Sequence, residues 1–183
     1  MNDVIVRSHK WDGALKGRLE TPPIAPQQIL EHSHAITHEA GDHASVEIFA
    51  ELRRRSSGVV PIAILGATYR PGTGPLVIRV AATGEYTLGG TRDLRSRLVR
   101  RLVSGLPLEY ATVVLAEIAR SAAELGFPGG IIEVNRGGYD EVDSSKFAFR
   151  KAAEFLTWAL LKSSSSGFPT EDDISLFLDS LQD

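Results

Sequence analysis

The sequence predicts an α+β protein in which one mainly antiparallel sheet carries two helices on one face. Residues 46–81 contain three short β-rich runs, residues 107–159 contain two amphipathic helical patterns, and a β-rich run at 131–134 lies between the helices. This order, βββ-α-β-α, favours a sheet covered by helices, because the apolar face of each element must be buried against another element. A length of 183 residues fits one compact domain.

The composition is that of an ordinary globular protein, with 43% hydrophobic residues and a formal net charge of −3. This balance gives no argument from net charge for nucleic-acid or membrane affinity, which leaves local basic clusters to consider. The lack of cysteine excludes disulfides, thiolate nucleophiles and Cys-ligated zinc. Asp3, Arg7 and Lys10 interrupt any signal-peptide core, and the longest apolar run, 58–67, is about half the ~20 residues of a membrane helix. We therefore expect a soluble, cytoplasmic protein.

Residues 1–45 are rich in turn and breaker residues, and we interpret them as an N-terminal extension. Within this segment, residues 27–40 predict one polar helix with Pro26 at its first turn. The main domain is then expected over residues 46–162.

Three strands are expected at the start of the main domain. Apolar residues alternate with polar ones from residue 46 to 51, and β-rich runs follow at 59–68 and 76–81. Gly58 and the PGTGP run at 71–75 separate them. The short connections indicate an antiparallel meander.

Residues 91–103 fit two patterns, because their leucines recur every four residues while arginine and valine also alternate. We favour a strand there. The next pattern is that of an amphipathic helix, with Pro107 at its start and Gly126 just past its end.

A short strand is expected at 131–134, with Gly137 and Gly138 marking the turn after it. The second helix then begins near Ser144 or Ser145 and has a broad apolar face. Both helices require a sheet to cover.

Residues 163–183 are expected to form a linker and a C-terminal helix. The run SSSSG at 163–167 has the composition of a flexible linker. Thr170 and Asp173 have capping-box-like spacing, and an amphipathic pattern follows them. We expect the apolar face of this helix to dock on the body or on a partner.

The sequence contains no motif that supports an enzyme. There is no GxxxxGK[ST] phosphate loop, no GxSxG, no HExxH and no GxGxxG that opens a helix. Four histidines fall within twelve positions, and His34 and His38 would share one face of the expected helix, which makes them candidate metal ligands. The alternative is a solvated polar helix, so we expect no metal and no cofactor.

Two basic clusters stand out in this acidic chain. Because a planar guanidinium can donate two hydrogen bonds to one phosphate, they are candidate contacts to an RNA backbone. The alternative is a charged outer face of a strand, paired with nearby acids such as Glu51 and Asp93. The candidate RNA-binding residues are Arg53, Arg54, Arg55, Arg92, Arg95, Arg97, Arg100 and Arg101.

The acidic run after Gly138 allows an acid/base interpretation, which we do not favour. Asp143, Ser144 and Ser145 stand at the expected start of a helix, where a side-chain oxygen accepts unpaired backbone N–H groups. We therefore expect these three residues to form a helix cap.

Two motifs lie within residues 106–155. Pro107, Glu109 and Tyr110 open the first helix, and the second motif comprises Gly138, Tyr139, Val142, Asp143, Ser144, Ser145, Ala148, Phe149, Ala152 and Ala153. Together they resemble domain IV of the translational GTPase elongation factor G, whose pattern joins a Pro-x-Glu-Tyr helix start to a GxYHxVDSSxxAFxxAA loop and helix. The resemblance implies the ribosomal-protein-S5 domain-2-like fold.

The same resemblance implies a tip loop, here Gly138, Tyr139, Asp140 and Glu141, because in that family the tip loops touch RNA and the A-site tRNA. The chain lacks the GTPase domain, so the resemblance implies no GTP hydrolysis. Asp140 stands where the family has histidine, which makes the tip acidic where it would approach phosphate.

Two functions follow as expectations. The first is a non-enzymatic protein that binds the ribosome or structured RNA through the two arginine clusters. The second is a protein-interaction or regulatory module without RNA binding, acting through the acidic tip loop or the C-terminal helix.

Overall fold

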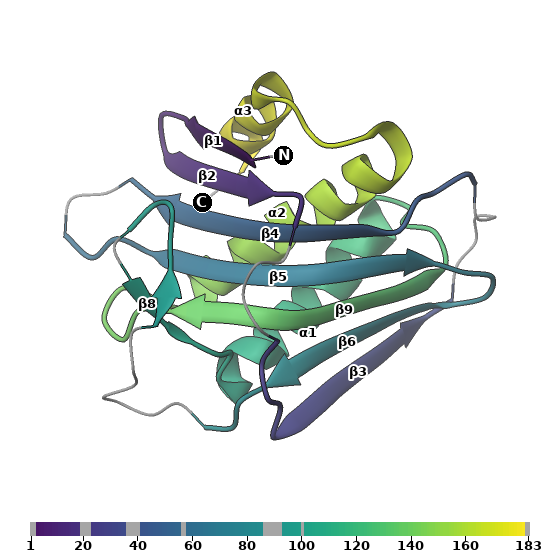
Figure 1. Cartoon of the computed structure of the whole chain (residues 1–183), viewed down its shortest axis with the longest axis horizontal. Coiled ribbons are helices and arrows are strands. Elements are labelled where there is room, and N and C mark those ends of the chain that lie inside the picture. Colours follow the sequence, from purple (N-terminus) through teal and green to yellow (C-terminus); the bar gives the residue numbers. More distant parts are fainter. Residues whose placement is uncertain are drawn as a thin grey trace.

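The computed structural model describes residues 3–18, 23–35, 41–55, 58–85, 93–99 and 101–181. They form an α+β fold with a mixed sheet (Figure 1). The strands described are β1 (Asp3–Arg7), β2 (Trp11–Lys16), β3 (Gln28–His34), β4 (Val46–Arg54), β5 (Ile62–Pro71), β6 (Leu76–Ala82), β7 (Leu94–Arg95), β8 (Arg101–Ser104) and β9 (Gly130–Tyr139). The helices are α1 (Leu108–Glu124), α2 (Lys146–Ser166) and α3 (Glu171–Ser180).

The sheet is mainly antiparallel, as the sequence predicts. Its strand order is β1-β2-β4-β5-β9-β6-β3, and β8 adds to the end of β9. The β4–β5 pair is a hairpin, but the expected meander is wrong at the next step, because β9 lies between β5 and β6. β6 and β9 run parallel, which requires a long crossover, and α1 lies within that connection.

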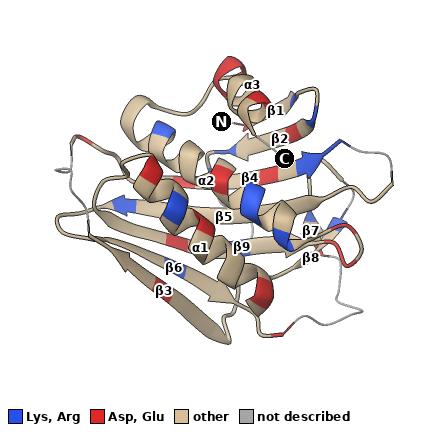
Figure 2. Cartoon of the chain, turned by 180° about the vertical axis from the view of Figure 1, so that it is seen from behind, with Lys and Arg blue, Asp and Glu red and all other residues tan. Residues whose placement is uncertain are grey.

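Helices α1 and α2 cover one face of the sheet, and α2 packs on β4 and β5 (Figure 2). On β4 the residues that face them alternate along the strand and are buried: Ile48, Ala50 and Leu52. The first helix starts directly after Pro107, as expected. Among the helices in the described ranges, none combines the length and the apolar character of a membrane crossing.

The N-terminal residues contribute three strands to the sheet. β3 occupies 28–34, where a polar helix was expected, so that prediction is wrong. The backbone of β3 pairs over its whole length with β6, and most of its side chains are exposed because it is an edge strand. A polar sequence is therefore compatible with a strand there, since only one long edge of it is paired and few of its side chains enter the core.

The serine run at 163–166 is the last turn of α2 and not a flexible linker. Its hydroxyls bond back to the helix: Ser164 Oγ and Ser165 Oγ each donate to Leu161 O at 2.9 Å. α2 ends at Ser166 and is capped by Gly167, whose φ of 93° favours glycine. These hydrogen bonds explain why a serine run with the composition of a linker can form the end of a helix.

Helix α3 is confirmed together with its capping box, because Thr170 Oγ1 accepts from Asp173 N and the Asp173 carboxylate accepts from Thr170 N. Ile174 and Leu178 are buried. α3 lies against β1 and β2, and a Cβ at Gly13 would be 3.0 Å from Leu178 Cδ1. The apolar face of α3 therefore docks on the body.

Gly137 and Gly138 do not mark a turn, because β9 continues through them to Tyr139. A Cβ at Gly138 would overlap the Leu94 side chain, and one at Gly137 would lie 3.0 Å from Gly105 O. These glycines permit the chain that precedes α1 to lie directly on β9.

Candidate nucleic-acid interface

The first arginine cluster is divided between the two faces of the sheet. Successive side chains of a strand point to opposite faces. Arg53 lies on the outer face, away from α1 and α2, and Arg54 lies over the ring of Phe147, with 5.7 Å from its Cζ to the ring centroid. Arg53, Arg54 and Arg55 therefore do not form the single patch that the sequence suggested.

Arg53 fastens two parts of the structure. Its Nη2 donates to Asp12 Oδ2 at 2.7 Å, and its Nη1 donates to Leu98 O at 2.9 Å. Arg55 donates to Ser8 O at 3.2 Å, and its Nε lies 3.8 Å from Asp12 Oδ1. These contacts occupy two of the arginines that were expected to contact RNA.

The described residues 93–99 and 101–104 lie on the outer face and contain β7 and β8, so within them the expected strand at 91–103 is present as two short pieces. Their leucines point toward the sheet and form a second apolar cluster on the outer face. The buried members of this cluster are Phe49, Ile62, Ile64, Leu94 and Leu102. Burial of these leucines holds the segment on the sheet, while Arg95, Arg97 and Arg101 are exposed.

Arg95 and Arg101 are directly opposite each other in the antiparallel β7–β8 pair, and both are exposed. Side chains opposite each other on two strands share a face with Cβ atoms about 5 Å apart, and like charges there are destabilising. Within the described part of the chain, neither arginine has a carboxylate partner. Arg92 and Arg100 lie outside the described residues.

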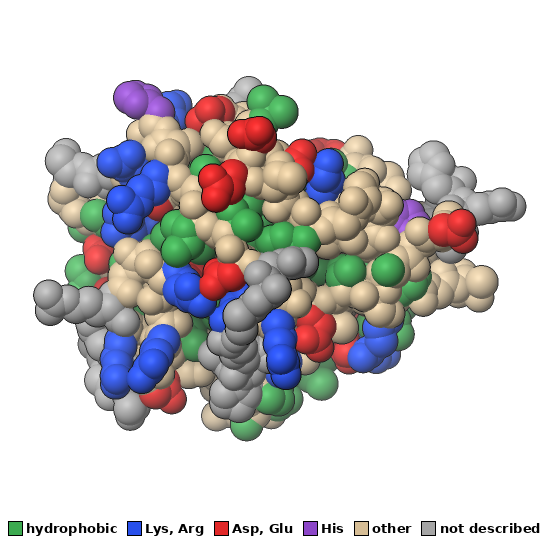
Figure 3. Space-filling model, turned by 45° about the horizontal axis from the view of Figure 1, so that its top comes forward, with side chains coloured by type: hydrophobic (Ala, Val, Ile, Leu, Met, Phe, Trp, Pro, Cys, Tyr) green, Lys and Arg blue, Asp and Glu red, His purple; other side chains and the backbone are tan. Residues whose placement is uncertain are grey.

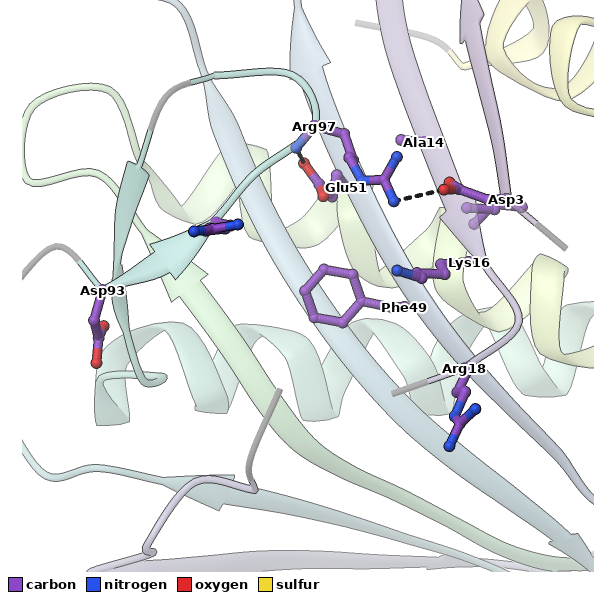
Figure 4. Close-up of a pocket in the computed structure, with 10 residues that line it drawn as sticks. Asp3, Ala14, Lys16, Arg18, Phe49, Glu51, Asp93 and Arg97 are labelled. Atoms are coloured by element: carbon purple, nitrogen blue, oxygen red, sulfur yellow. Dashed lines mark hydrogen bonds and ion pairs between the residues drawn. The ribbon is translucent and has the colours of Figure 1, made fainter. Parts of the chain in front are cut away.

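A cleft of about 520 Å³ lies beside this pair, between β1, β2 and β4 on one side and residues 93–97 on the other (Figure 4). Arg97 Nη2 forms an ion pair of 2.6 Å with Asp3 Oδ2 and so links the segment to β1. The side chains that line the cleft carry mixed charge: Asp3, Lys16, Arg18, Glu51, Asp93, Arg95 and Arg97, with Ala14, Leu15 and Phe49.

Glu51 is a charged side chain that is only 2% exposed. Its Oε2 accepts hydrogen bonds from Ser96 Oγ at 2.6 Å, Arg97 N at 2.8 Å and Leu98 N at 3.4 Å. Burial raises the pKa of Glu51, and these three hydrogen bonds act in the opposite direction. The carboxylate thus holds the 96–98 turn at the wall of the cleft.

Gly138 and Tyr139 of the expected tip loop are the last residues of β9, and the loop that follows them is held by its own acidic residue. Asp140 Oδ1 accepts from Val142 N at 2.9 Å and from Asp143 N at 3.1 Å. Tyr139 is buried, and its ring meets that of Tyr110 edge-on at 6.3 Å. Asp140 therefore shapes the loop, and Glu141 is half-buried beside it.

The expected helix cap is correct for one residue of three. Ser145 is the N-cap of α2, and its Oγ accepts from Ala148 N at 3.2 Å. Asp143 Oδ1 instead accepts from Val60 N, and Ser144 Oγ donates to Ile62 O at 2.6 Å. Asp143 and Ser144 thus fasten the tip loop to the start of β5.

The histidines do not gather in the described structure. His34 lies on the edge strand β3, so the expected helix face is wrong, and His38 lies outside the described residues. His43 Nδ1 is 3.0 Å from Ser164 Oγ. No group of three or more potential ligands from His, Cys, Asp and Glu occurs among the residues that the structure describes.

Sequence reasoning missed two cations of the cleft, Lys16 and Arg18, and the role of Glu51. Lys16 and Arg18 belong to a segment that the sequence placed outside the main domain, and nothing local indicates that β2 pairs with β4. Glu51 had a detectable signal, because it alternates with apolar residues on the outer face of a predicted strand.

In the space-filling view, basic side chains gather at one end of the molecule with acidic ones among them (Figure 3).

Comparisons with known proteins assign the chain to no family. No protein-family model matches the chain, and no curated protein matches it. Among solved structures, the crystal structure of a protein from Thermus thermophilus aligns with 19% identity and a TM-score of 0.35. The alignment covers 70% of this chain and 15% of that one, so the chain spans about one seventh of the length of the protein it matches.

Proposed function

We propose that this chain is a non-enzymatic protein that binds structured RNA, such as that of the ribosome, through the outer face beside β7 and β8, without GTPase activity. The observation that carries the proposal is the pairing of Arg95 with Arg101. Two exposed guanidinium groups face the same side of a two-residue ladder, and no carboxylate in the described part of the chain neutralises them. Such a pair favours an anion, and a phosphate accepts hydrogen bonds from both.

Neighbouring side chains extend this site along a path suited to a phosphate backbone. Arg18 is exposed at the rim of the cleft, and the Arg97 side chain is 45% exposed although it pairs with Asp3. Several phosphate contacts in one protein produce strong, salt-dependent binding. We therefore propose that Arg18, Arg95, Arg97 and Arg101 contact the phosphates. Arg53 and Arg55 support the interface through their contacts within the protein.

The resemblance to elongation factor G domain IV also supports the proposal. β6, α1 and β9 form a parallel crossover, which fits the proposed S5 domain-2-like fold. The tip loop and the β7–β8 pair lie at the same end of the sheet, because Val103 of β8 pairs with Tyr139 of β9 (Figure 1). An RNA on the arginine pair would therefore lie close to the tip loop.

The alternative function, a protein-interaction module, has less support in these contacts. The apolar face of α3 is buried against the body, with Ile174 and Leu178 at or below 1% exposure. Asp140, in the acidic tip, accepts two backbone hydrogen bonds within its own loop. Both features that were expected to recruit a partner thus have a structural role.

Co-sedimentation with ribosomes at about 50 and about 200 mM salt tests the proposal. We expect binding at the lower salt that falls by orders of magnitude at the higher salt. The double variant Arg95→Ala/Arg101→Ala is expected to lose most of this binding. Arg150→Ala is the matched control, because Arg150 is exposed on α2, on the opposite side of the sheet. Equal binding by the double variant and the control would refute the proposal.

A further inference from the structure

The cations of the outer face extend beyond the four arginines proposed above. Arg7 is the last residue of β1 and is exposed. It lies four residues after Asp3, whose carboxylate meets Arg97 on the outer face, so the Arg7 side chain projects from the same face of the sheet. Asp12 stands opposite Arg7 in the β1–β2 register and pairs with Arg53. Among the described residues, no carboxylate forms an ion pair with Arg7.

The exposed cations are spread along two directions of the sheet. Along the strands, Arg7 is level with Asp12 near the start of β2, and Arg18 follows the end of β2 at Lys16, which is about 13 Å further on. Across the strands, β1 is four strand spacings from β9, to which β8 with Arg101 is attached, and four spacings are about 19 Å. A single RNA strand presents one line of phosphates, whereas a duplex presents two backbones. The spread of charge in two directions therefore fits a duplex.

Internal contacts fix the positions of these cations relative to one another. The ion pair of 2.6 Å between Arg97 and Asp3 joins residues 93–99 to β1, the strand that carries Arg7 (Figure 4). Arg53 Nη1 donates to Leu98 O at 2.9 Å and holds the same residues to β4. Such a preformed surface suits double-stranded RNA, which proteins recognise mostly by shape and by contacts to phosphates and 2′-hydroxyls.

The aromatic side chain that lines the cleft is covered. Phe49 is 8% exposed and is packed in the apolar cluster of the outer face with Leu94 and Leu102. Proteins that bind unpaired strands stack successive bases on aromatic side chains. The ring of Phe49 is buried within the protein, whereas the arginines on this face are exposed. The face is therefore suited to contacts with the RNA backbone.

We propose that this face binds the paired backbones of double-helical RNA and that Arg7 is one of its phosphate contacts. Arg95 and Arg101 contact one strand of the duplex, and Arg7 contacts the other. The inference rests on the proposed function, since it specifies the class of RNA that the same face binds.

Fluorescence anisotropy with a mixed-sequence RNA duplex of about 16 base pairs, and with each of its separated strands, tests the assignment. At about 50 mM salt we expect the duplex to bind at least about tenfold more tightly than either strand, because the second backbone adds phosphate contacts. Arg95→Ala/Arg101→Ala is expected to weaken the binding of all three RNAs.

Arg7→Ala tests the second contact. It is expected to weaken duplex binding, to reduce the steepness of log affinity against log salt by about 1, and to leave the binding of the separated strands unchanged. Arg79→Ala is the matched control, because the Arg79 side chain is also exposed on the outer face, at 43%, but lies on β6 and pairs with Glu31 at 2.7 Å. Equal losses of duplex binding in the two variants would overturn the role of Arg7.

The outcomes separate this inference from the proposed function. If the separated strands bind as tightly as the duplex and Arg95→Ala/Arg101→Ala abolishes both, the chain binds RNA and the preference for a duplex is wrong. If neither the duplex nor its strands bind, the duplex assignment is wrong, and ribosome co-sedimentation then decides whether the proposed function fails with it.

Discussion

Arg53 of β4 and Asp12 of β2 form an ion pair of 2.7 Å in which the Asp12 side chain is only 3% exposed. The same guanidinium donates to Leu98 O, so one side chain joins β2 to the turn that borders the cleft. Asp12 and Arg53 stand directly opposite each other in the β2–β4 register. Arg53, which the sequence suggested as an RNA contact, therefore neutralises the buried carboxylate of Asp12.

Replacing Arg53 by alanine is expected to destabilise the fold. The substitution leaves the Asp12 charge buried without its closest partner, and losses of this kind are about 3 kcal/mol. Urea denaturation measures the change in the free energy of unfolding. Arg101→Ala is the control, with an expected change within about 0.5 kcal/mol, because Arg101 is exposed and has no carboxylate partner in the described structure. Similar losses in the two variants would contradict the role assigned to Arg53.

The stability of the protein is expected to depend on the protonation of Glu51. Burial raises its pKa above the ordinary value of 4.5, so the folded state holds this proton more readily than the unfolded state. The contribution of the group is therefore complete below about pH 4.5 and is lost as the pH rises through the folded pKa.

Glu51→Gln removes this titration, because glutamine stays neutral and keeps a carbonyl acceptor for Ser96. We expect the free energy of unfolding of the parent protein, relative to this variant, to fall as the pH rises from 4.5 toward neutrality. Urea denaturation at a series of pH values gives this difference. A difference that rises with pH would mean that the hydrogen bonds to Glu51 outweigh its burial.

Gly138 is expected to tolerate no side chain. A Cβ there overlaps Leu94, which anchors β7 in the apolar cluster of the outer face. Gly138→Ala should cost about 1 to 3 kcal/mol, the usual range for overpacking. Gly72→Ala is the control, because its Cβ would meet only Gly130 Cα at an ordinary 3.5 Å. Thermal unfolding of the two variants compares them, and equal midpoints would argue against the contact.

Helix α3 is expected to depend on Leu178. This side chain is 1% exposed, whereas Leu176 on the same helix is 76% exposed. Leu178→Ala removes buried apolar volume and is expected to cost about 2 to 5 kcal/mol. Leu176→Ala removes the same atoms from an exposed position and should change stability by less than about 0.5 kcal/mol. Circular dichroism during urea unfolding reports both, and comparable losses would show that α3 is docked through another face.

Several elements could be predicted because their causes are local. The start of α1 at Pro107, the Ser145 cap of α2 and the Thr170–Asp173 capping box depend on residues within one turn of each other. Apolar periodicity likewise located β4 and both helices of the main domain.

Other predictions were wrong because the causes are distant in sequence. Residues 28–34 form a strand because their backbone pairs with β6 at the edge of the sheet. Gly137 and Gly138 do not form a turn, because they permit the close approach of Gly105 and Leu94 to β9. The serine run at 163–166 was misinterpreted for a local reason, because composition alone does not show that serine hydroxyls bond back to the preceding turn.

Local patterns along the chain are sufficient for the α+β class, the helix starts and the presence of two arginine clusters, since periodicity and capping act over a few residues. Which arginines are available depends on contacts between distant segments. The ion pair with the buried Asp12 keeps Arg53 from contacting RNA. The β7–β8 register, in contrast, places Arg95 opposite Arg101 at the cleft. Strand pairing joins residues far apart in the chain, and the charge that remains unpaired is known only once those pairs exist.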